Sequence, residues 1–154
     1  MSITLRKTLD FDLVSEFDAA LDREASDLAA YRESGDRAHL KFTAGERPTV
    51  FHCRALSQAA MRKARGALTV SERGVSGMTE LAEIAFLHGV KDVAELYGPD
   101  GRAAVVTESD FIRGEDRLST TWLKKWDLPQ ELVDEIGGWI FRRSQLETPD
   151  LKNC

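Results

Sequence analysis

The most apolar segment of the sequence lies between Gly77 and Gly89, and it limits any compact fold to one built around it. Its apolar side chains cover nearly every side of a helix: Leu81, Ala82, Ile84, Ala85, Phe86 and Leu87. A helix that is apolar all round has to be buried. We therefore expect a central core helix that ends at Gly89. Because 154 residues suffice for one packed core but not comfortably for two, the rest of the chain should pack around this helix.

Two flanking segments have the periodicity of amphipathic helices. Ser57 is a good N-cap for a helix that we expect to continue to about Arg73. Its buried stripe should consist of Ala60, Met61, Ala64 and Leu68. A last helix should begin at Pro129, since proline is favoured in the first turn. Gly137 and Gly138 in its middle each cost about 1 kcal/mol relative to alanine, which predicts that another backbone approaches closely there.

Four short runs rich in β-forming residues predict two hairpins. The first would join residues 38–43 to residues 49–55. The second would join residues 93–97 to residues 102–107 through a Gly-Pro-Asp-Gly turn. Ser119-Thr120-Thr121 offers an N-cap to a short helix that we expect around Trp122, Leu123 and Trp126. These elements predict an α+β fold with a helical bundle-like core and one or two short β-hairpins.

The first 36 residues predict an N-terminal amphipathic helical arm. Between Asp12 and Arg32, apolar residues recur at three-, four- and seven-residue intervals among acidic neighbours, and Gly35 should end the helix. The stripe consists of Val14, Phe17, Leu21 and Leu28. We expect it to contact a second copy or another protein as well as its own domain. The expected organisation is an acidic helical arm at 1–36, a single α+β domain at 37–147 and a flexible C-terminal tail at 148–154.

Charge is divided into blocks along the chain. Residues 1–36 hold four basic and nine acidic residues, whereas residues 37–73 hold eight basic and two acidic ones. Residues 74–154 are acidic again, with nine basic and fifteen acidic residues. The basic block includes the exposed side of the helix after Ser57, with Arg62, Lys63 and Arg65. A basic helix beside an acidic arm predicts contacts between proteins, in which charge steers encounter and fixes register.

Candidate catalytic residues are few. Cys53 with His39 or His88 is conceivable as a nucleophile and its base, but a small residue in a strand is more simply a core residue. Carboxylates one helical turn apart, such as Glu131 and Glu135, are more simply solvated helix surface. The cysteines and histidines lack the spacing of zinc ligands. We predict no catalytic residue, no metal, no cofactor and no enzymatic activity. Without about 18 to 20 consecutive apolar residues, we also predict no membrane span.

Several motifs of residues 45–147 form a familiar succession. Residues 48–57 (PTVFHCRALS) predict a strand that leads into a helix. After the apolar helix come GVKDV at 89–93, GPDGR at 98–102, LSTTWL at 118–123, LPQELVDEIG at 128–137 and SQL at 144–146. This succession resembles small proteins encoded in tailed-bacteriophage morphogenesis clusters, a group described as tail-assembly-chaperone-like. The resemblance covers about two thirds of the chain and leaves out the acidic arm.

The resemblance implies a non-enzymatic role in tail or neck morphogenesis, as a virion component or as a tail assembly chaperone. Its partners would be other phage structural proteins, and we expect a homo-oligomer or a ring. The chain would act in the host cytoplasm during assembly, and as a virion component it would also be found in the particle. No active-site residue is transferred by the resemblance.

Three alternatives remain open at this point. The chain could be a small DNA-binding regulator that uses the basic helix after Ser57, although a sequence pI near 5.3 argues against a general nucleic-acid binder. Trp139 could anchor an interface or belong to ordinary core packing. Cys154 could crosslink neighbouring subunits or remain a free thiol without a role.

Overall fold

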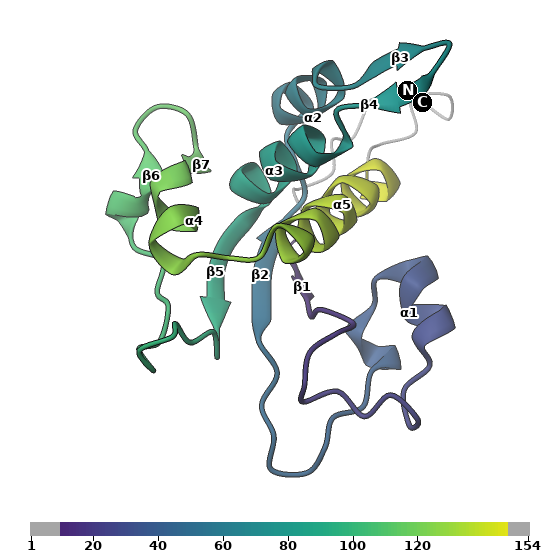
Figure 1. Cartoon of the computed structure of the whole chain (residues 1–154), viewed down its shortest axis with the longest axis vertical. Coiled ribbons are helices and arrows are strands. Elements are labelled where there is room, and N and C mark those ends of the chain that lie inside the picture. Colours follow the sequence, from purple (N-terminus) through teal and green to yellow (C-terminus); the bar gives the residue numbers. More distant parts are fainter. Residues whose placement is uncertain (1–9, 148–154) are drawn as a thin grey trace, which may run out of the picture.

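A three-stranded antiparallel sheet lies at the centre of the molecule (Figure 1). The computed structural model describes residues 10–147. The sheet has the order β1 (Asp10–Leu13), β2 (Val50–Arg54) and β5 (Val90–Ala94). The central strand β2 buries Phe51 and Cys53 on one face, and on its other face Val50 is buried beside the partly exposed His52 and Arg54.

Five α-helices surround the sheet in the described part of the chain. Their bounds are α1 (Leu28–Ser34), α2 (Gln58–Gly66), α3 (Met78–Gly89), α4 (Thr120–Trp126) and α5 (Gln130–Glu147). Two small antiparallel pairs and two 3-10 turns complete the structure: β3 (Thr69–Ser71) with β4 (Gly74–Ser76), β6 (Phe111–Ile112) with β7 (Arg117–Leu118), η1 (Arg37–His39) and η2 (Glu108–Asp110). The α+β prediction is confirmed, and α3 is the expected apolar helix.

The main core lies between the sheet, α3 and α5. Phe86 of α3 packs edge-on against Phe51 of β2, with ring centroids 5.9 Å apart, and also contacts Trp122 of α4 at 6.5 Å. Helices α3 and α5 approach so closely that a Cβ atom on Gly137 would lie 1.9 Å from the Ala82 carbonyl oxygen. The predicted close backbone contact at the glycine pair is therefore confirmed for Gly137.

A second, smaller core attaches the N-terminal residues to the sheet. It contains Val14, Leu21, Tyr31, Leu40 and Val50, with partly buried Leu28, Phe42 and Ala94 packed against it. Val50 alternates with Phe51 along β2, so this core lies on the face of the sheet opposite the main core.

The prediction of one continuous helix between Asp12 and Arg32 is wrong. Its place is taken by β1, a series of turns and the short helix α1. The aspartates in this stretch form local hydrogen bonds with the backbone: Asp18 accepts from Ala20 N, Asp22 from Ala25 N and Asp27 from Ala30 N. Such bonds compete with a continuous helix. Only the expected end at Gly35 is confirmed, with φ of +67°.

The first expected hairpin is also wrong, because β2 pairs with β1 and β5 instead of residues 38–43. Phe42 forms only an isolated bridge with Leu21. The second is reduced to one bridge between Tyr97 and Ala103, beyond the end of β5. Cys53 and Phe51 are both buried on one face of β2, so the interpretation of Cys53 as a core residue is confirmed.

Candidate functional site

Helix α2 is held in place by its cap and its apolar side. The Ser57 Oγ accepts a hydrogen bond from Ala60 N at 3.1 Å, which confirms the predicted N-cap. Ala60, Met61 and Ala64 are buried as expected. The helix ends at Gly66 instead of near Arg73, because the following residues form the hairpin of β3 and β4.

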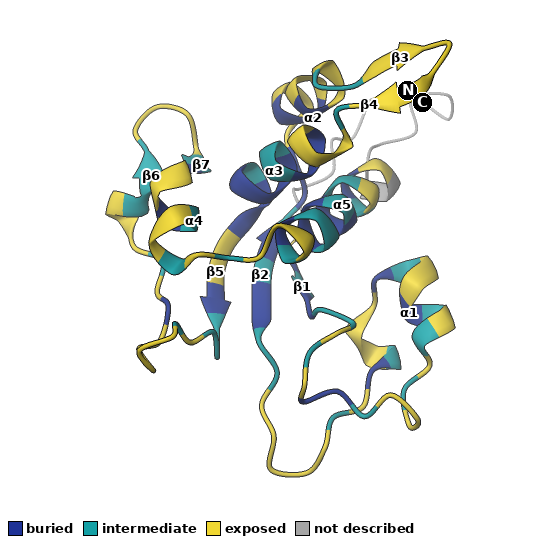
Figure 2. Cartoon of the chain, in the orientation of Figure 1, coloured by how far each residue is buried: buried dark blue, intermediate teal, exposed yellow. Residues whose placement is uncertain are grey.

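This hairpin projects away from the sheet, and every residue of its two strands is exposed (Figures 1 and 2). Val70 and Val75 face each other across the two strands. Gly77 at the hairpin base has φ of +91°, and a Cβ atom there would lie 2.0 Å from the Ala67 carbonyl oxygen. Only glycine fits this contact, so the base of the hairpin is fixed against the end of α2.

The hairpin carries apolar side chains in solvent. Val70 is 79% exposed, Val75 56% and Met78, the first residue of α3, 58%. An isolated two-stranded hairpin is at best marginally stable in water. Exposed apolar side chains gathered on such an element are typical of a surface that binds another molecule.

Basic residues surround these apolar side chains in the sequence. Arg62, Lys63 and Arg65 on α2 are exposed, as is Arg73 in the hairpin turn. Within residues 10–147 none of the four takes part in an ion pair. We use the term hairpin surface for the set Arg62, Arg65, Val70, Arg73, Val75 and Met78.

The predicted interface residues of the N-terminal stretch do not share one face. Val14 and Leu21 are buried in the chain's own second core, and Leu28 is partly buried against it. Phe17 is 74% exposed. The expected apolar stripe is therefore wrong, since it depended on a continuous helix.

Trp139 lies in the interior, with 8% of its surface exposed. Its ring packs against Tyr31 at 5.8 Å, and a Cβ atom on Gly35 would lie 3.0 Å from it. The Arg142 guanidinium lies over the ring at 4.5 Å. Trp139 thus joins α5 to α1 within one chain. Cys154 lies outside the described residues.

Glu135 makes a contact within the fold that the sequence did not indicate. Its carboxylate accepts hydrogen bonds from Ser15 Oγ at 2.6 Å and from Glu16 N at 2.8 Å. Burial raises its pKa, although these two hydrogen bonds oppose the shift. The interpretation of Glu135 as solvated surface is wrong, because its hydrogen bonds connect α5 to the turn after β1.

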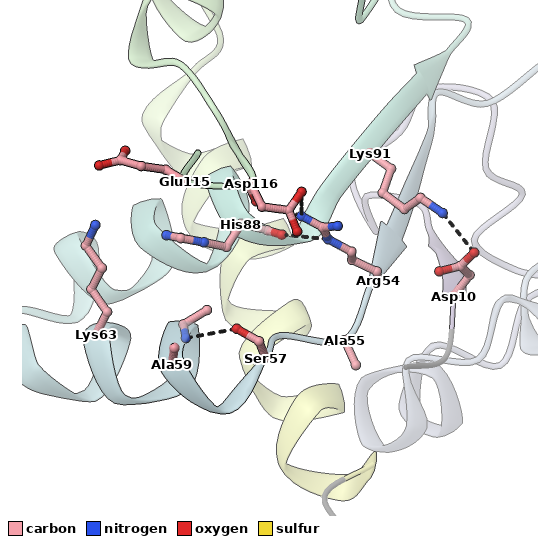
Figure 3. A pocket seen from close by; sticks show the side chains of 11 residues that line it. Asp10, Arg54, Ala55, Ser57, Ala59, Lys63, His88, Lys91, Glu115 and Asp116 are labelled. Atoms are coloured by element: carbon pink, nitrogen blue, oxygen red, sulfur yellow. Dashed lines mark hydrogen bonds and ion pairs between the residues drawn. The ribbon is translucent and has the colours of Figure 1, made fainter. Parts of the chain in front are cut away.

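A cavity of about 420 Å³ lies beside the N-terminus of α2 (Figure 3). On one side, Arg54 Nε donates to the His88 carbonyl at 3.2 Å and its Nη2 lies 3.0 Å from Asp116 Oδ1. Lys91 pairs with Asp10 at 2.9 Å. Most charges that line this cavity are thus neutralised by one another, and they connect β1, β2, β5 and the turn between β6 and β7.

His88 lies in the same cavity, and its buried Nε2 has no hydrogen-bond partner among residues 10–147. Burial lowers the pKa of His88, and the nearby cations Lys63, Arg117 and Arg54 lower it further. The sequence placed His88 at the end of the apolar helix but gave no sign of this cavity, because its walls come from segments distant in the chain.

Cys53 is buried, and burial raises the pKa of its thiol. His52, the neighbour of Cys53 in β2, forms a hydrogen bond with Asp12, with 2.7 Å between Nδ1 and Oδ1. Among the described residues, no group of three or more His, Cys, Asp or Glu side chains is arranged to hold a metal ion. None of the helices within residues 10–147 is long and apolar enough to span a bilayer.

Comparison with protein families, curated proteins and solved structures finds no significant match to this chain.

Proposed function

We propose that this chain is a non-enzymatic assembly protein of a tailed bacteriophage, acting in tail or neck morphogenesis through contacts with other structural proteins. The observation that carries the proposal is the hairpin surface, where Val70 and Val75 are exposed on an element that projects away from the sheet. The resemblance of residues 45–147 to phage morphogenesis proteins supplies the biological setting. The chain acts as a virion component or as a tail assembly chaperone, in the host cytoplasm while particles form.

The test removes the gene from a phage that encodes the chain and examines the lysate by electron microscopy. We expect tails to be missing or malformed, with plating restored when the chain is supplied in trans. Normal tails and normal titre without the chain would contradict the proposal. Mass spectrometry of purified particles then separates the two roles, because a virion component is present in stoichiometric amounts and a chaperone is not.

A second candidate function is DNA binding by α2, which is favoured by one observation. Arg62, Lys63 and Arg65 are exposed and form no ion pair within the described part of the chain. A helix that bound phosphates would lose affinity steeply with salt. An electrophoretic shift of duplex DNA that disappears with salt and in the triple variant with alanine at these positions would favour this function over assembly.

A further inference from the structure

The helix–hairpin unit, residues 58–78, is one of two surfaces of opposite charge on the molecule. It carries four basic residues and one acidic residue. The other surface is the acidic segment, residues 15–36, which carries seven acidic and two basic residues. Six of the seven carboxylates are in no ion pair of the described structure: Asp18, Asp22, Glu24, Asp27, Glu33 and Asp36. Both surfaces thus hold charge that the folded chain leaves uncompensated.

The acidic segment also offers an apolar contact. Phe17 is 74% exposed beside a cavity of about 190 Å³. The cavity is lined by residues of the segment itself, of β2 and the residue before it, of the chain after β5 and of α5: Ser15, Phe17, Asp18, Thr49, Phe51, Leu96 and Leu132. An exposed aromatic ring at the edge of a partly apolar hollow suits an aliphatic side chain such as that of Val70. Each surface therefore combines an exposed apolar side chain with an excess of charge of one sign.

The two surfaces of one chain do not meet. In Figure 1 the hairpin lies at the top of the long axis, whereas the turns before α1 lie in the lower half. At the hairpin base, the Gly77 backbone lies against the Ala67 carbonyl at the end of α2, away from the turns before α1. Contact between the two surfaces requires a second copy.

We propose that copies of this chain associate head to tail, with the β3–β4 hairpin of one copy docked on the acidic segment of the next. Val70 and Val75 contact Phe17 and the adjoining cavity, while Arg65 and Arg73 face the uncompensated carboxylates. The inference rests on the proposed function of the hairpin surface and names its partner. Contact between unlike surfaces leaves one of each surface free, so such association continues into a ring or a filament. Hairpin-to-hairpin pairing is disfavoured, because it would bring basic residues together.

The experiment uses two variants that each disable one surface. Val70→Asp removes the hairpin contact and Phe17→Asp removes the acceptor, and both positions are more than 70% exposed, so the fold is retained. Val105→Asp is the matched control, since Val105 is 54% exposed and belongs to neither surface. Circular dichroism verifies folding, and sedimentation velocity at increasing protein concentration measures association.

We expect wild type and Val105→Asp to form species larger than a dimer, which dissociate as salt screens the charges. Each surface variant alone should stay monomeric. An equimolar mixture should form a dimer and stop, because it contains one intact hairpin and one intact acceptor. The inference would be overturned if the wild type stayed monomeric. It would also be overturned if the equimolar mixture of the two variants stayed monomeric, or if the wild type formed a dimer that Phe17→Asp left intact. A monomeric wild type in a phage that still requires the chain would overturn self-association and leave the proposed function standing.

Discussion

The hydroxyl group of Tyr31 joins α1 to the residue that follows β1. It donates a hydrogen bond to the Val14 carbonyl oxygen and accepts one from Val14 N at 3.3 Å. Tyr31 and Val14 are both fully buried, and this burial raises the pKa of the Tyr31 hydroxyl to about 12. One side chain thus satisfies both backbone groups of a buried residue.

Tyr31→Phe should lower the free energy of unfolding by about 1–3 kcal/mol, because the peptide groups of Val14 would remain buried without a partner. Urea denaturation measures the change. The control is Tyr97→Phe, whose hydroxyl lies on an exposed residue and bonds Glu95, and we expect an effect within about 0.5 kcal/mol. Equal losses in the two variants would show that Tyr31 contributes through its ring alone.

We expect His88 to make folding stability depend on pH. In the folded state, burial and the cations Lys63, Arg117 and Arg54 lower the pKa of His88, while Asp116 opposes the shift. In the unfolded chain this pKa has its ordinary value of about 6.5. Below that value the unfolded state binds the proton more readily, so folding stability falls as pH decreases. Above that pH, the contribution of neutral His88 to folding stability is fully present.

We therefore expect the unfolding free energy of the wild type to decline more steeply between about pH 7 and pH 5 than that of His88→Gln. His39→Gln, on η1 and outside the cavity, should keep the wild-type slope. Chemical denaturation across this pH range measures both. A slope unchanged by His88→Gln would contradict the burial of this imidazole.

At the scale of elements, the contact of α3 with α5 provides a pair of adjacent glycines with opposite expectations. Gly137→Ala would place a methyl group 1.9 Å from the Ala82 carbonyl oxygen, so the helices must separate. Gly138 has nothing within 4 Å of the same position. We expect Gly137→Ala to destabilise the protein by about 1–3 kcal/mol or more. Gly138→Ala should stabilise it by roughly 0.5–1 kcal/mol, because alanine favours the helix.

Thermal unfolding of the two variants measures this difference directly. A lower melting temperature for Gly137→Ala and a higher one for Gly138→Ala is the expected result. Similar shifts in both variants would mean that α3 and α5 do not pack through Gly137.

Helices α2 to α5 could be predicted from the sequence because their signals are local. Ser57 and Ser119 cap α2 and α4, and Gly89 closes α3. The central sheet could not be predicted in the same way, because β2 finds its partners about 40 residues away on either side. Asp10 pairs with Arg54, and Phe51 with Val93. The periodicity of apolar residues indicates which residues are buried, but it does not indicate which strands pair.

The hairpin surface was predicted only in part. Its basic residues Arg62 and Arg65 stood out as a charge pattern, and the structure leaves them exposed. Val70 and Val75 could not be predicted as part of this surface, because each is a single apolar residue within a polar stretch. The available signal was two short β-forming runs around a turn before Gly74. The expected helix from Ser57 to about Arg73 covered the residues of β3, so the hairpin could not be predicted beside it.

At the scale of the whole molecule, charge compensation inside the fold is incomplete. Ion pairs such as Arg54 with Asp116 and Lys91 with Asp10 join the elements around the central sheet. The helix–hairpin unit and the acidic segment keep charges that no described residue neutralises. Charge left over on separate surfaces steers association with a partner more than it stabilises the fold.

In the proposed function, the exposed hairpin is the surface through which this chain acts in particle assembly. The most direct measurement is the titre of a phage lacking the gene when it is complemented with Val75→Asp or with the control Val105→Asp. The two valines are 56% and 54% exposed, so both variants should fold alike. We expect Val105→Asp to restore the wild-type titre and Val75→Asp to leave it at the level of the deletion. Full complementation by Val75→Asp would contradict the account.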